Sequence, residues 1–171
     1  YCKNDFKKQI KMNKIPQVNL DDYLTGNPDI KKKFINDLGK GFSEIGFIAL
    51  KGHLLNDSVK ESLYGEIKKF FNLSDEIKSK YIISGLASQR GFTPFGKEHA
   101  KGRNVGDLKE FWHFGQYVKN EPELENKYPK NVMVDELKEF NSVGKKTYEL
   151  LEETGRHVLG CLLYTSPSPR D

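Results

Sequence analysis

Four histidines are the side chains of this 171-residue chain best suited to bind a metal ion or to move a proton. His113 stands in an aromatic segment with Glu110 three residues before it, and positions i and i+3 of a strand face opposite sides. His157 follows a glutamate by four residues, which predicts a modest surface pair on a helix. We expect a turn or cap role for His53 and solvent exposure for His99, so none of the four is expected to be a metal ligand.

The charged residues and glycines in the middle of the chain suggest two other chemistries, and both have a simpler structural explanation. Asp107, Lys109 and Glu110 could serve acid–base catalysis, but charged residues that alternate with aromatic ones are typical of a half-buried strand. Five glycines lie within 82–106, yet no Gly-Lys-Ser/Thr sequence accompanies them, so they do not form a phosphate-binding loop. We expect these glycines to give a long loop its flexibility.

Arg90 is unusual in a chain that contains 24 lysines and only four arginines. An arginine in such a context indicates a need for a planar donor that forms two parallel hydrogen bonds. Gly91 and Phe92 follow it, and the glycine permits close approach of the backbone. The structural alternative is that Arg90 pairs with Glu98 or Asp107.

Hydrophobic periodicity and turn residues predict an α+β fold, with helices packed on a few short strands. The expected elements are a strand over 15–20, a turn over 21–27, a helix over 28–45, a buried strand over 46–52, a helix capped by Asn56, Asp57 or Ser58 that ends near 71, a short helix over 74–81, a loop over 82–106, a strand over 107–118, a polar connection over 121–130 and a long helix from about 132. So few strands leave open sheet edges, which normally require a partner.

The two ends of the chain differ in composition from the rest. Residues 1–11 precede the first methionine and carry +3 of the net charge of +4, so we expect them to be a non-native leader. Residues 161–171 change abruptly to a Ser-Pro-Ser-Pro sequence and resemble read-through of an adapter sequence, the alternative being a disordered native tail. The expected domain therefore covers 12–160, and because both cysteines lie outside it, no disulfide is expected.

Composition also excludes several classes of partner. The mean hydropathy of −0.68 and the absence of a long apolar run argue against a membrane protein. No segment has the charged-then-apolar form of a signal peptide, so a cytoplasmic protein is expected. The lysines are scattered among acidic residues, which argues against a nucleic-acid-binding groove.

A series of sequence blocks runs in order along residues 14–160: IPQVNLDDYL, IGFIALKGH, KKFFNLSDEIKSKY, QRGFTPFGKEHAKG and DLKEFWHFG. Together they resemble the N-terminal region of the isopenicillin N synthase-like non-haem Fe(II)/2-oxoglutarate-dependent oxygenases. The resemblance implies the N-terminal part of a double-stranded β-helix oxygenase fold. It also implies a parent enzyme that oxidises a small organic substrate with Fe(II) and 2-oxoglutarate.

The resemblance implies that a His-x-Asp pair and a distant His hold the iron, and that an Arg-x-Ser pair grips 2-oxoglutarate. Here no Asp or Glu stands two residues after any histidine, and no arginine begins an Arg-x-Ser sequence. We therefore expect no metal or cofactor site within this chain, and we expect the missing C-terminal catalytic domain to be its partner.

In the family, the segment that contains Arg90 lies near the mouth of the catalytic barrel. The resemblance therefore makes Arg90 and Phe92 candidates for substrate binding. The alternative function is a stand-alone, non-catalytic interaction module that uses an open sheet edge. A downstream His-x-Asp…His in the natural gene would distinguish the enzyme from the module.

Overall fold

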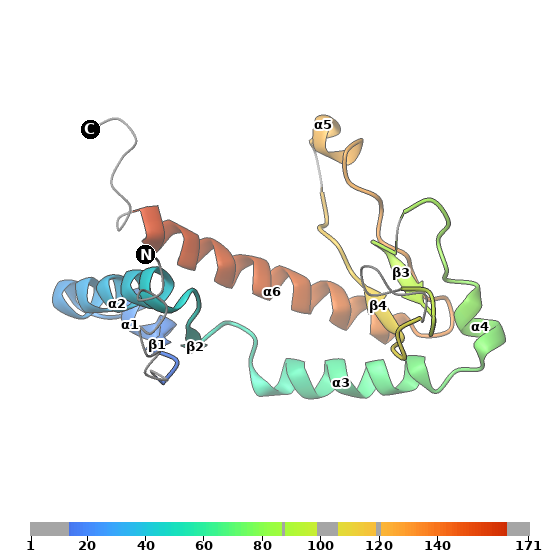
Figure 1. The fold of residues 1–171 in the computed structure, drawn as a ribbon, viewed down its shortest axis with the longest axis horizontal. Coiled ribbons are helices and arrows are strands. Elements are labelled where there is room, and N and C mark those ends of the chain that lie inside the picture. The colour runs from blue at the N-terminus through green and yellow to red at the C-terminus, as the bar shows by residue number, and fades with distance from the viewer. Residues whose placement is uncertain (1–13, 87, 99–105, 119–120, 164–171) are drawn as a thin grey trace, which may run out of the picture. The chain divides into compact units, whose positions relative to one another are not determined.

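The structure is a computed structural model that describes residues 14–86, 88–98, 106–118 and 121–163. Figure 1 shows its helices and short strands, with α6 (Lys138–Leu163) as the longest helix. The chain divides into two compact units, one formed by the chain up to His53 together with the segment from Thr154, and the other by Leu54–Glu153. In the part of the chain that the structure describes, no helix is both long and apolar enough to cross a bilayer.

The first unit contains the expected strand–helix–strand sequence and one helix that was not expected. Its elements are β1 (Gln17–Asn19), α1 (Leu20–Leu24), α2 (Pro28–Lys40), the π-helical turn η1 (Gly41–Ile45), β2 (Ala49–Lys51) and the end of α6. The turn expected over 21–27 is wrong because the Asn19 side chain accepts the backbone N–H of Asp21 at 3.2 Å and caps α1.

The expected helix over 28–45 is confirmed as α2 followed by η1. The Asn27 side chain accepts the N–H of Ile30 at 3.0 Å, and Pro28 occupies the first helical position. Gly46 ends the helix with a φ of +93°, a conformation that glycine adopts without strain. β2 then pairs in parallel with β1, Val18 opposite Leu50, but it is only half-buried and not the fully buried strand we expected.

A small apolar core joins the elements of the first unit. Its buried members are Val18, Leu20, Phe34, Leu38 and Cys161. The boundary expected at residue 161 is therefore not an end of the folded structure, because α6 runs to Leu163 and Cys161 is fully buried. Burial raises the pKa of the Cys161 thiol. The foreign origin of the two ends stays a prediction, and residues 1–13 and 164–171 lie outside the described residues.

The second unit contains the two helices that the sequence predicted, one that ends near residue 71 and one that begins after residue 74. Its elements are α3 (Asp57–Phe71), α4 (Asp75–Ser79), β3 (Gly91–Thr93), β4 (Phe111–His113), the short α5 (Pro122–Glu125) and the first part of α6. Of the three possible caps, Asn56 is the one that accepts the N–H of Val59, at 3.0 Å. Ser74 caps α4 through the N–H of Ile77.

The loop expected over 82–106 contains strand β3, which pairs antiparallel with β4. Phe92 lies opposite Trp112, and its N–H donates to the Tyr81 carbonyl at 3.0 Å. Gly91 has a φ of +74°, and a Cβ there would lie 2.4 Å from the same carbonyl. At Gly91 the glycine therefore permits the close backbone approach that the sequence predicted, and it does not serve loop flexibility. Gly102, another of the five glycines, lies outside the described residues.

Three further boundaries differ from expectation. The strand expected over 107–118 is reduced to the three residues of β4, and α5 lies within the segment expected to be an irregular connection. The long helix begins at Lys138 and not near 132, because the buried Asn141 side chain binds both the N–H and the carbonyl of Val134 at 2.8 Å.

An aromatic cluster forms the core of the second unit. The Phe70 ring lies 4.8 Å from Trp112 and 5.1 Å from Phe140, measured between ring centroids. Phe92 and Tyr81 also contact Phe70, at 5.8 and 6.3 Å, as does the neighbouring Phe71 at 5.3 Å. The cluster thus joins α3, both strands and α6 through one fully buried side chain.

We expect Phe70→Ala to lower the free energy of unfolding by about 3–5 kcal/mol, because the substitution leaves a cavity among rigid rings. Urea titration followed by Trp112 fluorescence measures it. Tyr64→Ala is the matched control, because Tyr64 lies on the same helix and is 63% exposed, and it should change the value by no more than about 0.5 kcal/mol. Equal effects of the two variants would contradict the assignment of Phe70 as the centre of the core.

Tyr81 also makes a polar contact with the segment that precedes α6. Its hydroxyl donates to the Glu136 carboxylate and accepts the N–H of Asp135 at 3.0 Å. The bond from Tyr81 is the main reason why the pKa of Glu136 is lowered, and Lys80 contributes to the same shift. Burial, followed by the bond to Glu136, raises the pKa of Tyr81.

The hydrogen bond between Tyr81 and Glu136 predicts that the fold loses stability in acid. A carboxyl group with a lowered pKa in the folded state stabilises the fold above its ordinary pKa, here 4.5, and loses that contribution as the pH falls through the folded value. Glu136→Gln should therefore reduce stability at pH 7 and flatten its decline below pH 4.5. Glu123→Gln on α5 is the control in urea titrations at several pH values. Parallel pH profiles for wild type and Glu136→Gln would contradict the role of this pair.

Candidate functional site

Arg90, directly before β3, is buried, and its hydrogen-bond partners among the described residues are neutral. Its side chain is 7% exposed. Nε donates to the Pro129 carbonyl at 3.1 Å, Nη1 to the Gln89 carbonyl at 2.7 Å and Nη2 to Gln116 Oε1 at 3.0 Å. The guanidinium therefore connects the start of β3 to two segments that follow β4.

The segment after β4 is shaped to receive Arg90. A Cβ at Gly115 would lie 1.9 Å from Arg90 Cζ, so only glycine allows the guanidinium to lie against this backbone. On the other side, Asn131 accepts the N–H of Gly115 at 2.7 Å and donates to its carbonyl at 2.8 Å. Residues 115 and 116 therefore lie between the guanidinium of Arg90 and the side-chain amide of Asn131.

The carboxylates expected as alternative partners of Arg90 are used elsewhere. Glu98 and Asp107 both pair with Lys109, at 3.2 and 3.3 Å. Glu110 pairs at 3.0 Å with Lys78, a buried lysine on α4. Burial acts to lower the pKa of Lys78, but its hydrogen bonds to Glu110 and Asp75 outweigh this effect and raise the pKa. No ion pair found among the described residues includes Arg90.

Phe92 belongs to the aromatic core and also lines a cavity. It is 4% exposed. The cavity, of about 260 Å³, is bordered by residues of the 82–85 and 92–97 segments and by Ser88. Thr93 lies in the same wall and is 1% exposed, and no residue in the described ranges forms a hydrogen bond with its hydroxyl. The structure thus places Phe92 at the boundary between the core and a small polar hollow.

The histidines lie in separate places. His113 Nδ1 lies 2.6 Å from the Ser88 carbonyl, which fixes its ring on the surface of β4. His53 follows β2, His157 is on α6 without an ion pair to Glu153, and His99 lies outside the described residues. Within the described ranges, no three His, Cys, Asp or Glu side chains are close enough to hold one metal ion. The residues at hand therefore do not fit an iron site.

Arg90 and Phe92 were recognisable in the sequence as candidates, but their surroundings were not. Gln116 and Asn131 carry no local signal, since an amide side chain in a polar segment is common. Their roles depend on contacts between residues that are 26 and 16 positions apart. Of these residues, only Gly115 could have been noticed in the sequence, because it is a glycine that directly follows a run of aromatic residues.

We expect Arg90→Lys to lower the free energy of unfolding by about 2 kcal/mol, because an ammonium group cannot satisfy three acceptors in a planar fork. Urea titration followed by Trp112 fluorescence is the measurement. The same substitution at Arg156, which is exposed on α6, should change stability by no more than about 0.5 kcal/mol. An Arg90→Lys variant as stable as wild type would show that the three bonds do not support the fold.

Comparison with known proteins identifies the family. Residues 15–136 match the family described as "non-haem dioxygenase in morphine synthesis N-terminal". The 2-oxoglutarate-dependent dioxygenase imqE of Aspergillus flavus is 36% identical over 86 residues, 50% of this chain and 24% of that protein. The 1-aminocyclopropane-1-carboxylate oxidase of Dictyostelium discoideum is 25% identical over 95% of this chain and 45% of that protein.

Two solved structures are also similar to this chain. A 2OG-Fe(II) oxygenase family protein of Caulobacter crescentus is similar with a TM-score of 0.73 and 30% identity, over 86% of this chain and 47% of that chain. A full-length Neurospora crassa protein, solved in complex with alpha-KG, shares the fold with a TM-score of 0.67 at 24% identity, over 45% of its chain. Our chain thus spans no more than about half the length of each of these relatives. The resemblance drawn from the sequence blocks is confirmed at this level: the chain belongs to the family of the N-terminal region of 2-oxoglutarate-dependent non-haem dioxygenases.

Proposed function

We propose that this chain is the N-terminal part of an Fe(II)/2-oxoglutarate-dependent oxygenase that oxidises a small organic substrate. The observation that carries the proposal is the match of residues 15–136 to the N-terminal family, together with its extent, since the chain covers a quarter to a half of its oxygenase relatives. Fe(II) would activate oxygen in the complete enzyme, and 2-oxoglutarate would supply electrons.

In this proposal the iron and 2-oxoglutarate are held by a C-terminal catalytic domain with a double-stranded β-helix fold, and the enzyme is cytoplasmic. The described part of our chain supports this division, because its histidines lie in separate elements. The chain would supply helices and strands that extend the sheet of the barrel. Both observed sheets have only two strands, so each has open edges for such an extension.

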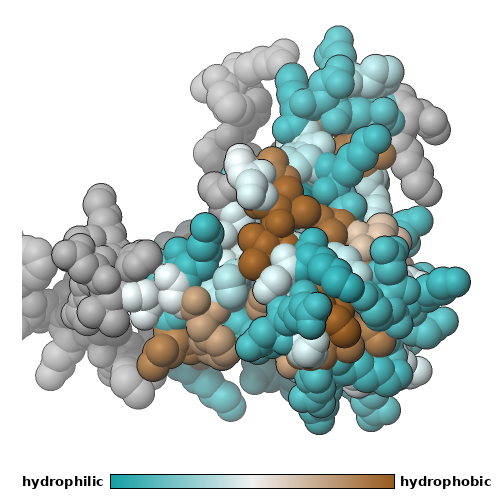
Figure 2. Space-filling view, turned by 90° about the vertical axis from the view of Figure 1, so that its right-hand side faces the viewer, coloured by the Kyte–Doolittle hydropathy of each residue, from teal (hydrophilic) through white to brown (hydrophobic). Residues whose placement is uncertain are grey.

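A surface for this partner domain is also available. On the side of α4, the molecule shows an apolar patch surrounded by hydrophilic side chains (Figure 2). Exposed apolar side chains in the same unit include Phe95 and Leu108, which are 58% and 93% exposed. Contiguous exposed apolar surface is typical of a site that another protein surface covers.

Arg90 and Phe92 remain our candidates for contact with the substrate. Phe92 would act through the cavity that it lines. Arg90 would act mainly through its positive charge, since three of its five N–H donors already bind Gln116 and two carbonyls. Both roles concern the mouth of the catalytic barrel in the complete enzyme.

The direct test is anaerobic calorimetry with Fe(II) and 2-oxoglutarate. The 171-residue chain should show no binding tighter than about 10 μM, roughly −7 kcal/mol. The same chain joined to the natural downstream coding sequence should bind both. His113→Ala and His99→Ala variants of the short chain are the controls for any binding that does occur.

Two outcomes would contradict the proposal. Tight binding by the short chain that disappears in either histidine variant would mean that it holds a metal site of its own. Failure of the joined protein to bind iron would argue against the oxygenase assignment. The two-stranded sheets would then favour the alternative, a non-catalytic interaction module that pairs through an open edge.

A further inference from the structure

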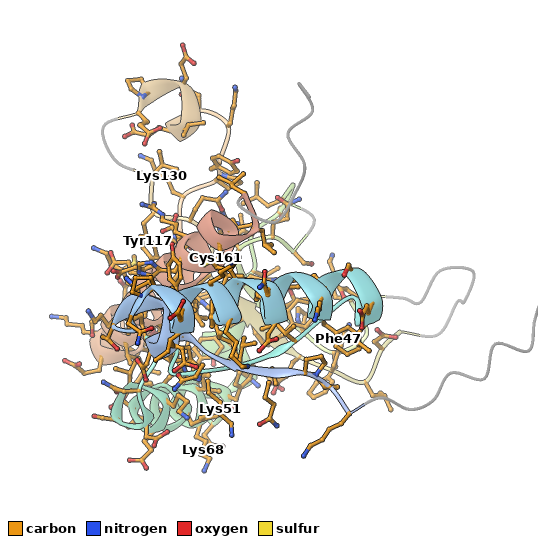
Figure 3. The ribbon with its side chains drawn as sticks, turned by 90° about the vertical axis from the view of Figure 1, so that its left-hand side faces the viewer. Phe47, Lys51, Lys68, Tyr117, Lys130 and Cys161 are labelled. Atoms are coloured by element: carbon orange, nitrogen blue, oxygen red, sulfur yellow. The ribbon has the colours of Figure 1, made fainter. Side chains whose placement is uncertain are left out.

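A second cavity of the Leu54–Glu153 unit lies directly beyond Arg90. It measures about 350 Å³ and is lined by residues 116–118 and by the segment from Glu125 to Met133. This volume is within the range of roughly 300–1,000 Å³ typical of sites for small organic molecules. Figure 3 labels Tyr117 and Lys130, which both contribute to its wall.

The base of this cavity is held in place by partly buried hydrogen bonds. Arg90 binds Gln116 and the Pro129 carbonyl, so the same guanidinium fixes both walls. Asn131, also a lining residue, clamps Gly115 from the opposite segment. Because both walls are connected at their base, the cavity is formed before any ligand arrives.

The lining combines apolar surface with hydrogen-bond donors. Apolar and aromatic surface comes from Tyr117, Val118, Tyr128, Pro129 and Met133. Arg90 occupies Gln116 Oε1, so the amide nitrogen of Gln116 is the group that remains to donate. The Tyr117 hydroxyl is buried and has no hydrogen-bond partner among the described residues, so Tyr117 contributes its ring to the cavity wall.

Charge favours an anion in this cavity. Arg90 is a buried cation without an ion pair among the described residues, and buried charges in proteins are normally compensated. Lys130 adds a second positive charge at the rim. Two carboxylates oppose them. Glu125 is exposed on α5. Glu149 lies 3.8 Å from Lys145, and burial, followed by the charge of Glu149, raises the pKa of Tyr117.

We propose that this cavity binds a small aromatic carboxylate. The ring of the ligand lies against Tyr117, Tyr128 and Met133, and its carboxylate accepts a hydrogen bond from the Gln116 amide nitrogen. Arg90 is a positioning residue that orients the Gln116 amide and supplies the compensating charge. Every residue of this site belongs to the present chain, so the inference does not rest on the oxygenase assignment.

The test uses the complete 171-residue chain and three probes of the same shape, namely benzoate, benzamide and benzylamine. Amide chemical shifts in NMR titrations report binding and its location. Benzoate should bind and shift the signals of residues 115–118 and 129–133. Benzamide should bind about tenfold more weakly, a difference of one charge-assisted hydrogen bond, and benzylamine should not bind.

One variant removes the recognising amide without removing the fold, and a second tests the neighbouring tyrosine. Gln116→Glu keeps the shape and gives Arg90 an ion-pair partner, so it should preserve stability while it abolishes benzoate binding by charge repulsion. Tyr117→Phe removes a buried hydroxyl that has no partner among the described residues and keeps the ring, so it should leave both stability and benzoate binding unchanged. Tyr64→Phe, on the exposed face of α3, is the matched control and should bind like wild type.

The inference would be overturned by either of two results. One is the absence of benzoate-induced shifts at millimolar concentration in a folded chain. The other is benzoate binding that Gln116→Glu leaves unchanged, which would place the ligand elsewhere. Loss of binding in Gln116→Glu with a preserved urea midpoint would support it, because a purely structural role of Gln116 changes stability and not ligand selectivity.

Discussion

Phe70 contacts aromatic rings that come from four separate parts of the chain, and the second unit depends on that contact. Trp112 and Phe140 lie about 5 Å from it, and Phe92 and Tyr81 lie slightly farther away. None of the strands involved exceeds three residues, so backbone pairing alone would not hold them. Burial of large rings supplies the stabilisation that such short strands lack.

This aromatic cluster also fixes the position of the candidate site. Phe92 is fixed by the cluster, and Arg90 directly precedes the same strand, so the position of the guanidinium is set by the core behind it. From there Arg90 reaches Gln116 and Pro129, which form two walls of one cavity. A buried cation that organises neutral groups is costly unless something compensates it, and this cost is the physical reason to expect an anionic ligand.

The sequence predicts those parts of the fold that local chemistry determines. Asn27 and Asn56 begin α2 and α3 at the expected places because a cap needs only neighbouring residues. Strand β3 was missed because it exists only through β4, some twenty residues later, and through the close approach at Gly91. For the same reason the rarity of Arg90 was visible in the sequence, whereas its acceptors at Gln116 and Pro129 were not.

Native-state hydrogen exchange on the 171-residue chain tests the central claim most directly, namely that the core and the candidate site form one cooperative structure. Three amides report on it: Phe92, bound to the Tyr81 carbonyl; Val134, bound to Asn141; and Gly115, bound to Asn131. If the aromatic core positions the site, all three should open with the same free energy and the same dependence on denaturant. A Gly115 amide that opens at much lower free energy, without denaturant dependence, would show that the site is not held by the core and would contradict this account.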